Sequence, residues 1–199
     1  MVSTKQTVSS RATILKRIRS AGVPASPLPS LASRQRDLKS EELLKQFEAT
    51  LQAIGGSVVS GLSLNELSDH LLQKGGGKRL VNTCEFLAIG EQLSTYEPQA
   101  LENVFLAVVP GALAVAENGA VWVAEQQMKA RALPFICEHL ALVVEVGSLV
   151  ANMHEAYQKL GSPTSDFGVF IAGPSKTADI EQSLVLGAHG ARTLTVYFR

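Results

Sequence analysis

The sequence has few cysteines, few aromatic residues and no long hydrophobic run. Its two cysteines, Cys84 and Cys137, lie far apart and form no Cys-x-x-Cys pair. This argues against an iron–sulfur cluster or zinc site held by this chain alone and predicts a reducing, cytoplasmic location. The longest uncharged apolar stretch, residues 104–116, is too short to span a bilayer and contains Pro110 and Gly111. The N-terminus has no continuous apolar segment, so we expect no secretory signal.

Acidic residues are missing from one end of the chain. Apolar residues make up 46% of the 199 positions, which is enough for one domain with a sizeable core. Residues 1–36 hold seven of the 18 Lys and Arg residues and none of the 18 acidic ones, so a +7 arm precedes a −7 body. We therefore expect a basic helical arm and linker at 1–36 and an α/β domain at 37–199.

The basic arm allows two interpretations. Its charge would suit nucleic acid, but it lacks the interleaved aromatic residues of a single-strand binder, so we expect no nucleic-acid partner. Val8, Ala12, Leu15 and Ile18 fall on one face at helical spacing. This pattern favours an amphipathic helix that packs on the acidic body or on a partner subunit. The proline-rich segment at 22–30 then acts as a linker.

From residue 40 onward, helical patterns alternate with short apolar strands. This alternation predicts an α/β protein with a mainly parallel sheet covered by helices. Asn118-Gly119 predicts a hairpin turn within the β structure at 104–126. The remaining predicted helices are 40–54, 63–77, 148–161 and 178–190, and the remaining predicted strands are 57–61, 78–84, 139–146, 166–173 and 193–198.

The segment Gly-Pro-Ser-Lys-Thr at 173–177 separates a predicted strand from a predicted helix. We expect it to be a loop at the carboxyl end of a parallel strand, where ligands of open α/β sheets bind. Its backbone N–H groups, two hydroxyls and a cation suit phosphate or carboxylate. Alternatively, the segment only caps the helix and its lysine is solvated. The anion-binding candidates are Gly173, Pro174, Ser175, Lys176 and Thr177, and Asp179 and Glu181 would support the helix start.

The same segment carries a family resemblance. Gly-Pro-Ser-Lys-Thr-Ala-Asp-Ile-Glu at 173–181, followed by Gly187, His189 and Gly190, resembles the C-terminal signature of the LUD-domain family of lactate-utilisation protein C. The start of that family is similar to residues 11–22. The resemblance implies a fold similar to the NagB/RpiA/CoA-transferase class and a role in oxidising L-lactate to pyruvate. It also implies that partner proteins carry the iron–sulfur clusters and that this subunit binds no cofactor or metal.

Catalytic candidates are few. Ala-Glu-Asn-Gly at 116–119 is similar to the turn that holds the nucleophilic glutamate of class I CoA-transferases, so Glu117 supports the alternative of a stand-alone acyl- or CoA-transferase. The same residues form a common hairpin signal. His139 begins a predicted strand and either lines a site or bonds at the strand end. His189 is expected at a helix C-terminus, where the dipole favours a cation.

Two further features stay open at this point. The segment Gly-Gly-Gly-Lys-Arg at 75–79 could hold phosphate, but it lies at the amino end of the predicted sheet and fits a helix-ending loop. The chain is also compatible with a homo-oligomer.

Overall fold

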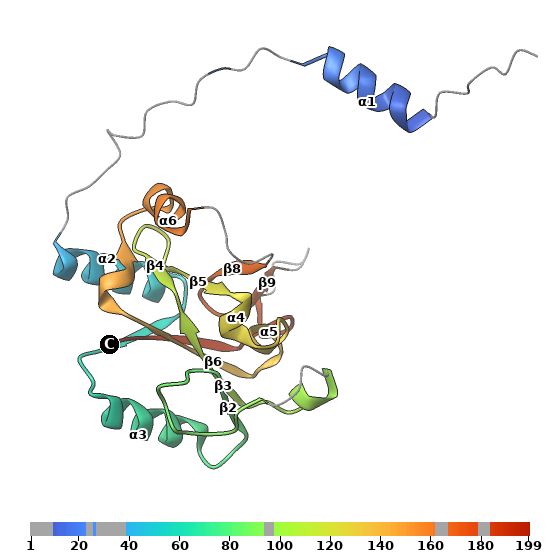
Figure 1. Ribbon diagram of the computed structural model, residues 1–199. Helices are drawn as coiled ribbons and strands as arrows, with labels where there is room; N and C mark the ends of the chain where they lie inside the picture. Colours follow the sequence, from blue (N-terminus) through green and yellow to red (C-terminus); the bar gives the residue numbers. More distant parts are fainter. Residues whose placement is uncertain (1–9, 23–25, 27–38, 94–97, 162–166, 179–183) are drawn as a thin grey trace, which may run out of the picture. The chain divides into compact units, whose positions relative to one another are not determined.

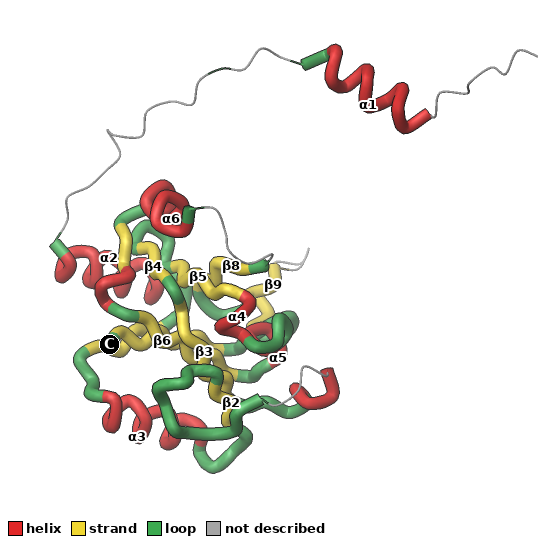
Figure 2. The backbone as a smooth tube through the Cα atoms, in the orientation of Figure 1, coloured by secondary structure: helices red, strands yellow, loops and turns green. Residues whose placement is uncertain are grey.

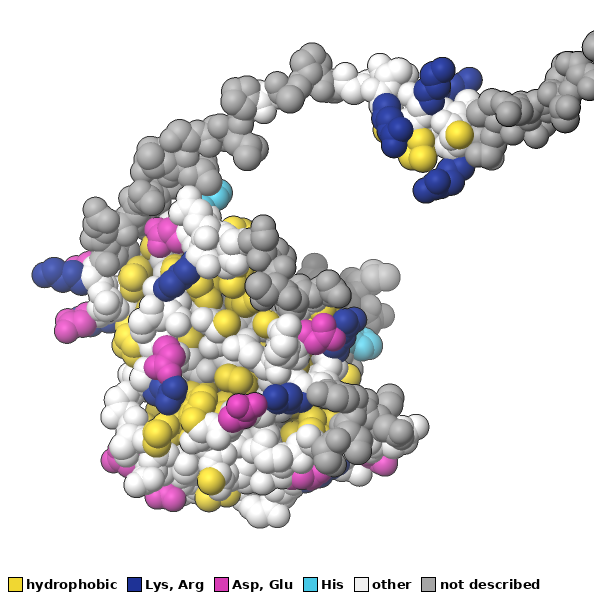
Figure 3. Space-filling model, in the orientation of Figure 1, with side chains coloured by type: hydrophobic (Ala, Val, Ile, Leu, Met, Phe, Trp, Pro, Cys, Tyr) yellow, Lys and Arg dark blue, Asp and Glu magenta, His cyan; other side chains and the backbone are white. Residues whose placement is uncertain are grey.

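The computed structural model describes residues 10–22, 26, 39–93, 98–161, 167–178 and 184–199, and the chain divides into two units (Figure 1). The first unit, Met1–Arg34, contains the expected helix, α1 (Ser10–Ser20), with no buried residue. Ile14 and Ile18 are exposed, and Leu15 is half-buried. Figure 3 shows basic and hydrophobic side chains side by side on this helix.

The second unit, Gln35–Arg199, is built on a five-stranded parallel sheet, which confirms the α/β prediction. The strand order is β1-β11-β6-β3-β2. Thr195 lies opposite Ser57 on one neighbour, and Thr193 lies opposite His139 on the other. The amino ends of the central strands therefore share one edge, which we call the amino edge. The strands are β1 (Ser57–Ser60), β2 (Leu80–Asn82), β3 (Leu106–Gly111), β6 (His139–Val144) and β11 (Thr193–Phe198).

The two faces of this sheet bury alternate residues, as the two-residue period of a strand requires. Leu140 and Leu142 of β6 pack with Phe47 of helix α2 (Ser40–Ala53). Ala141 and Val143 pack on the other face, which α3 (Leu64–Gly75) covers. Figure 1 shows α3 and α2 on opposite sides of the sheet. Ser63 and Glu66 form the capping box that starts α3, with 2.8 Å from the Ser63 N–H to Glu66 Oε2.

A second, mixed sheet lies beside the first and was not predicted as a separate layer. Its order is β7-β4-β5-β8, and Figure 2 shows its short strands above the parallel sheet. β4 and β5 form the hairpin expected around Asn118-Gly119. β8, however, runs antiparallel to β5, so the prediction of a parallel strand before residue 173 is wrong. The strands are β4 (Leu113–Val115), β5 (Ala120–Ala124), β7 (Leu149–Val150) and β8 (Gly168–Ala172).

Two predicted helices differ from the structure. The helix expected at 148–161 begins later, as α6 (Met153–Leu160), because Leu149 and Val150 pair with β4 as β7. The Asn152 side chain accepts a hydrogen bond from the Glu155 N–H and caps α6. The prediction of a helix at 178–190 is also wrong for the described part of that range, residues 178 and 184–190. There β9 (Lys176–Ala178) pairs antiparallel with β10 (Leu184–Leu186), because backbone pairing overrides a short apolar pattern that fits either structure.

Short helical turns complete the described part of the chain. They are η2 (Pro98–Leu101), α4 (Glu125–Met128), α5 (Leu133–Ile136) and η3 (Val146–Ser148). Among the described helices, none combines the length and the hydropathy needed to cross a bilayer.

Candidate functional site at the amino edge of the parallel sheet

The amino edge gathers polar and cationic side chains around a small depression. A hollow of about 340 Å³ is lined by residues 55–57, Lys74, His139 and residues 193–195, and we call it the basic hollow. Lys74 reaches this edge because α3 follows β1 and returns toward the start of the sheet. The hydroxyl-bearing residues are there because they begin β1 and β11.

A chain of hydrogen bonds organises one wall of the basic hollow. Lys74 Nζ donates to Thr195 Oγ1 over 2.7 Å, and that hydroxyl lies 2.8 Å from Ser57 Oγ. Ser57 Oγ also donates to the Leu194 carbonyl over 3.4 Å. Burial lowers the pKa of Lys74. Within the described residues, Lys74 has no carboxylate partner to offset this loss of hydration.

His139 also lines the hollow. Its Nδ1 lies 2.8 Å from Thr193 Oγ1, and its ring stacks edge-on against Phe105 at 4.6 Å between centroids. Burial is the main cause that lowers the pKa of His139; Glu138 opposes the shift, and Lys74 and other cations add to it. A neutral imidazole can both donate and accept hydrogen bonds.

The loop at 173–177 packs against the rim of the same hollow, and the expectation that it lies at the carboxyl edge is wrong. The Ser175 N–H donates to the Ala191 carbonyl over 2.8 Å, just before the amino end of β11. A Cβ atom on Gly55 would lie 3.3 Å from Lys176 Nζ and 3.6 Å from Pro174 Cγ. The exposed Lys176 ammonium therefore sits at the C-terminal end of α2, where the helix dipole favours a cation.

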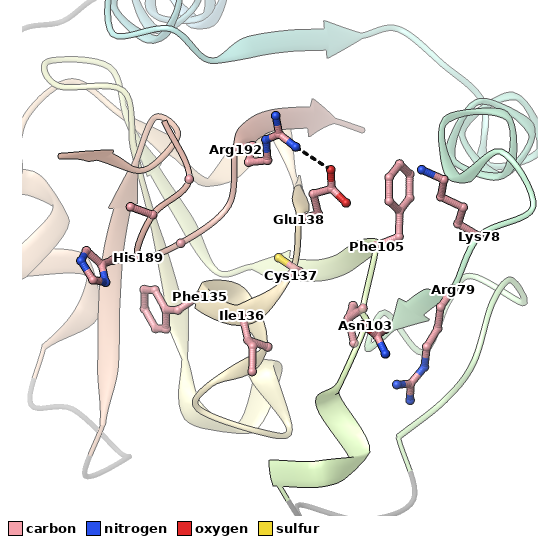
Figure 4. Close-up of a pocket in the computed structure, with 14 residues that line it drawn as sticks. Lys78, Arg79, Asn103, Phe105, Phe135, Ile136, Cys137, Glu138, His189 and Arg192 are labelled. Atoms are coloured by element: carbon pink, nitrogen blue, oxygen red, sulfur yellow. Dashed lines mark hydrogen bonds and ion pairs between the residues drawn. The ribbon is translucent and has the colours of Figure 1, made fainter. Parts of the chain in front are cut away.

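A larger groove is shown in Figure 4. Its residues Glu138 and Arg192 directly precede His139 and Thr193 of the basic hollow. The groove measures about 760 Å³, and Lys78 and Arg79 lie at one end with His189 and Phe135 at the other. Lys78 Nζ lies 4.0 Å from the centre of the Phe105 ring. In the middle of the groove, Arg192 is paired with Glu138 at 3.0 Å.

The residues of the groove test the sequence predictions for the glycine segment at 75–79 and for His189. Gly76 ends α3 in a left-handed conformation, so the glycine segment is the helix-ending loop, and it also delivers Lys78 and Arg79 to the groove. Both Arg79 and Arg192 are already engaged by carboxylates, Arg79 by Glu91 at 2.9 Å. His189 lies exposed in the turn between β10 and β11, so its expected place at a helix C-terminus is wrong.

Glu117 lies apart from the basic hollow. Its carboxylate accepts a hydrogen bond from the Met153 N–H over 3.0 Å, at the start of α6. It is exposed and does not line either depression at the amino edge. The turn that holds Glu117 thus supports a neighbouring helix. This turn is connected to the loop at 173–177 only through strand pairing, because Ala120 at the start of β5 lies opposite Ala172 at the end of β8.

The other predicted residues are only partly described. Thr177 and Ala178 belong to β9, so no helix begins at Ala178, where one was expected. Asp179 and Glu181 lie outside the described residues. In the described part of the chain, no three His, Cys, Asp or Glu side chains gather as metal ligands. Cys84 and Cys137 are both free and buried, and burial raises the pKa of each thiol to about 12.

Sequence reasoning missed Lys74 and Arg192 as parts of this site. Arg192 bonds a residue 54 positions away, a relationship that no local pattern contains. The available signal for Lys74 was its place in the last turn of a helix that returns to the amino edge.

Comparisons with known proteins agree with this architecture. A crystal structure of a DUF162 family protein from Deinococcus radiodurans superposes with a TM-score of 0.64 at 21% identity, covering 81% of this chain and 98% of that one. A lactate utilization protein C from Bacillus pumilus is 28% identical over 183 residues, which cover 77% of this chain and 76% of that protein. Another from Shouchella clausii is 32% identical over 83 residues, which cover 39% of this chain and only 36% of that protein.

The family itself is defined by a longer match. The model of the LUD domain matches residues 40–198, which include every strand of both sheets and the loop at 173–177. The basic helix α1 lies outside the match. Distant homologues named lactate utilization protein C align over most of the chain. The chain therefore belongs to the LUD domain family.

Proposed function

We propose that this chain is a cluster-free subunit or accessory protein of a system that oxidises L-lactate to pyruvate. The observation that carries the proposal is the alignment, over most of the chain, with relatives named lactate utilization protein C. In this proposal, partner proteins carry the iron–sulfur clusters and transfer the electrons. The chain acts in the cytoplasm, and its two free, buried cysteines support a reducing compartment.

The chain binds a small anion at the loop that holds Gly173 and Lys176. Support comes from the position of the Lys176 ammonium beside Gly55, which also lines the basic hollow. A left-handed φ of 72° at Gly173 allows the loop to approach Ile54 at the end of α2. An anion at this rim would meet a cation that has no carboxylate partner among the described residues.

We also propose that the fold is of the NagB/RpiA/CoA-transferase class, to which a parallel sheet flanked by α2 and α3 conforms. That class supplies the alternative function, a stand-alone acyl- or CoA-transferase that uses Glu117. The capping bond from Met153 to Glu117 favours the first function, since it engages the carboxylate that would attack an acyl group.

Deleting the gene tests the proposal. The deletion strain should lose growth on L-lactate as the carbon source and keep growth on pyruvate, and the wild-type gene should restore growth. A Lys176→Ala gene should restore it poorly, while Lys45→Ala, a change of equal charge on α2, should restore it fully. Normal growth of the deletion strain on L-lactate would contradict the proposed function. Acyl transfer by the purified chain that Glu117→Gln abolishes would support the alternative instead.

A further inference from the structure

The basic hollow has a cation whose hydrogen-bonding capacity is largely unused. Among the described groups, Lys74 Nζ donates only to Thr195 Oγ1, so its remaining N–H groups have no protein acceptor there. The Lys74 side chain is half-buried, and burial without a counter-ion is unfavourable for an ammonium group. An anion in the hollow would remove this penalty and accept the remaining hydrogen bonds.

The other polar groups of the hollow can each donate a hydrogen bond to a ligand or accept one from it. The hydroxyls of Ser57, Thr193 and Thr195 and the ring of His139 line it or bond to one another there. Hydroxyls and neutral imidazole rings can act in either direction. They therefore suit an oxygen that is a hydroxyl in one ligand and a carbonyl in another, next to a carboxylate that needs the lysine.

The size of the hollow restricts the ligand further. Its volume of about 340 Å³ lies at the small end of ordinary ligand sites, whereas the larger groove measures about 760 Å³. Larger anions fit the groove, but there Arg79 and Arg192 are already paired with carboxylates. The remaining cation of the groove, Lys78, is exposed over the Phe105 ring, whereas Lys74 in the hollow is half-buried and has no carboxylate partner among the described residues. The small hollow is therefore the better site for an acid of a few carbon atoms.

We propose that the basic hollow binds a short 2-hydroxy or 2-oxo monocarboxylate, with Lys74 holding the carboxylate and the hydroxyls and His139 contacting the 2-oxygen. Lys176, at the rim beside Gly55, adds a second positive charge. This inference rests on the proposed function and names the ligand class and the principal cation of its site. It predicts that the hydroxy and oxo acids bind with similar affinity, because the same groups serve both.

Calorimetric titration of the full chain with L-lactate, pyruvate and propionate tests the site. Lactate and pyruvate should bind within a few-fold of each other, and propionate, which lacks the 2-oxygen, about tenfold more weakly. Lys74→Met should weaken pyruvate binding by at least about tenfold, the effect of one charge-assisted hydrogen bond. The matched control is Lys78→Met, which removes the same charge from the groove and should change affinity less than about threefold. Equal losses in the two variants, or none in Lys74→Met, would overturn the site.

A second measurement uses the unaltered chain, so it does not depend on the folding of a variant. Acetylation of each lysine is followed by mass spectrometry with and without saturating pyruvate. Bound pyruvate should slow the modification of Lys74 about fivefold or more, while Lys78 reacts at an unchanged rate. Unchanged Lys74 reactivity would remove the site.

The two proposals fail separately. If pyruvate protects Lys74 but the gene is dispensable for growth on L-lactate, the binding site is supported and the proposed function is contradicted. If growth on L-lactate is lost but pyruvate does not protect Lys74, the proposed function is supported and the binding site is contradicted.

Discussion

The imidazole of His139 and the hydroxyl of Thr193 meet across two neighbouring parallel strands, with 2.8 Å between Nδ1 and Oγ1. Both residues begin their strands, so the contact marks the amino edge of the sheet. Burial, together with the nearby cations of Lys74, Arg192 and Lys78, lowers the pKa of His139, and Glu138 is the acidic group that opposes the shift. The histidine is therefore neutral at neutral pH and can share a proton with a ligand oxygen.

Acid should destabilise the chain through His139. Because its folded pKa lies below the ordinary value of about 6.5, the unfolded chain binds more protons as the pH falls from there toward the folded pKa. The stability that neutral His139 contributes is thus present above about pH 6.5 and lost below it. Urea unfolding at pH 7.5 and 5.5 should show a smaller pH dependence for His139→Gln than for the wild type. His189→Gln, which removes an exposed histidine, is the control, and equal pH dependence in all three chains would contradict the account.

The contact between the loop and α2 should be sensitive to one methyl group. Gly173 has a φ of 72°, and a Cβ atom there would lie 3.1 Å from the Ile54 carbonyl oxygen. Gly61 has a similar φ of 77°, but a Cβ atom there would meet no atom within 4 Å. Gly61→Ala should cost about 1 kcal/mol of unfolding free energy from backbone strain alone. Gly173→Ala should cost about 1 kcal/mol more from the added contact. Equal losses in denaturant titrations would show that the loop does not pack on α2.

Removing the hydroxyl of Tyr197 should not lower the unfolding free energy. Its Oη is buried without a hydrogen-bond partner in the described structure, and burial raises the pKa of Tyr197 to about 12. An unsatisfied buried polar atom costs about 1–3 kcal/mol, so Tyr197→Phe should leave the unfolding free energy unchanged or raise it by about 1 kcal/mol. Tyr157→Phe, on an exposed side chain that keeps its ring contact with Phe170, is the control. A loss above about 1 kcal/mol in Tyr197→Phe would mean that the hydroxyl has a partner.

The basic arm should matter for assembly and not for folding. No residue of α1 is buried, so deleting residues 1–36 should leave the melting temperature of the remaining chain unchanged. If the arm binds an acidic surface of a partner subunit, the deletion should weaken association at low salt and have little effect at high salt. Calorimetry and co-purification with the partners measure the two effects. Unfolding of the truncated chain, or normal assembly at low salt, would contradict this role.

The parts of the fold that local chemistry determines were predictable. The capping box of Ser63 and Glu66 and the Asn118-Gly119 turn each depend on a few neighbouring residues. The parallel sheet followed from the alternation of elements. The position of Leu184–Leu186 was not predictable in this way, because a short apolar run fits a helix or a strand until its pairing partner at Lys176–Ala178 is known.

The candidate site shows the same limit. The sequence singled out Lys176 and His139, but it placed the loop at the carboxyl edge, because a general rule for open sheets was applied to a strand that turned out to belong to a second sheet. Lys74 belongs to no sequence motif. Its importance arises from α3 returning it to Thr195, which lies 121 positions away in the chain.

The place of the ligand is tested most directly by nuclear magnetic resonance of the isotope-labelled chain during titration with pyruvate. The amide signals of Ser57, His139, Thr195 and Lys176 should shift together and saturate at one affinity, because all four lie in or beside the basic hollow. Shifts confined to the opposite edge of the sheet, at Ser60, Val144 and Phe198, with the amino edge unchanged, would contradict a small-acid site at the start of the strands.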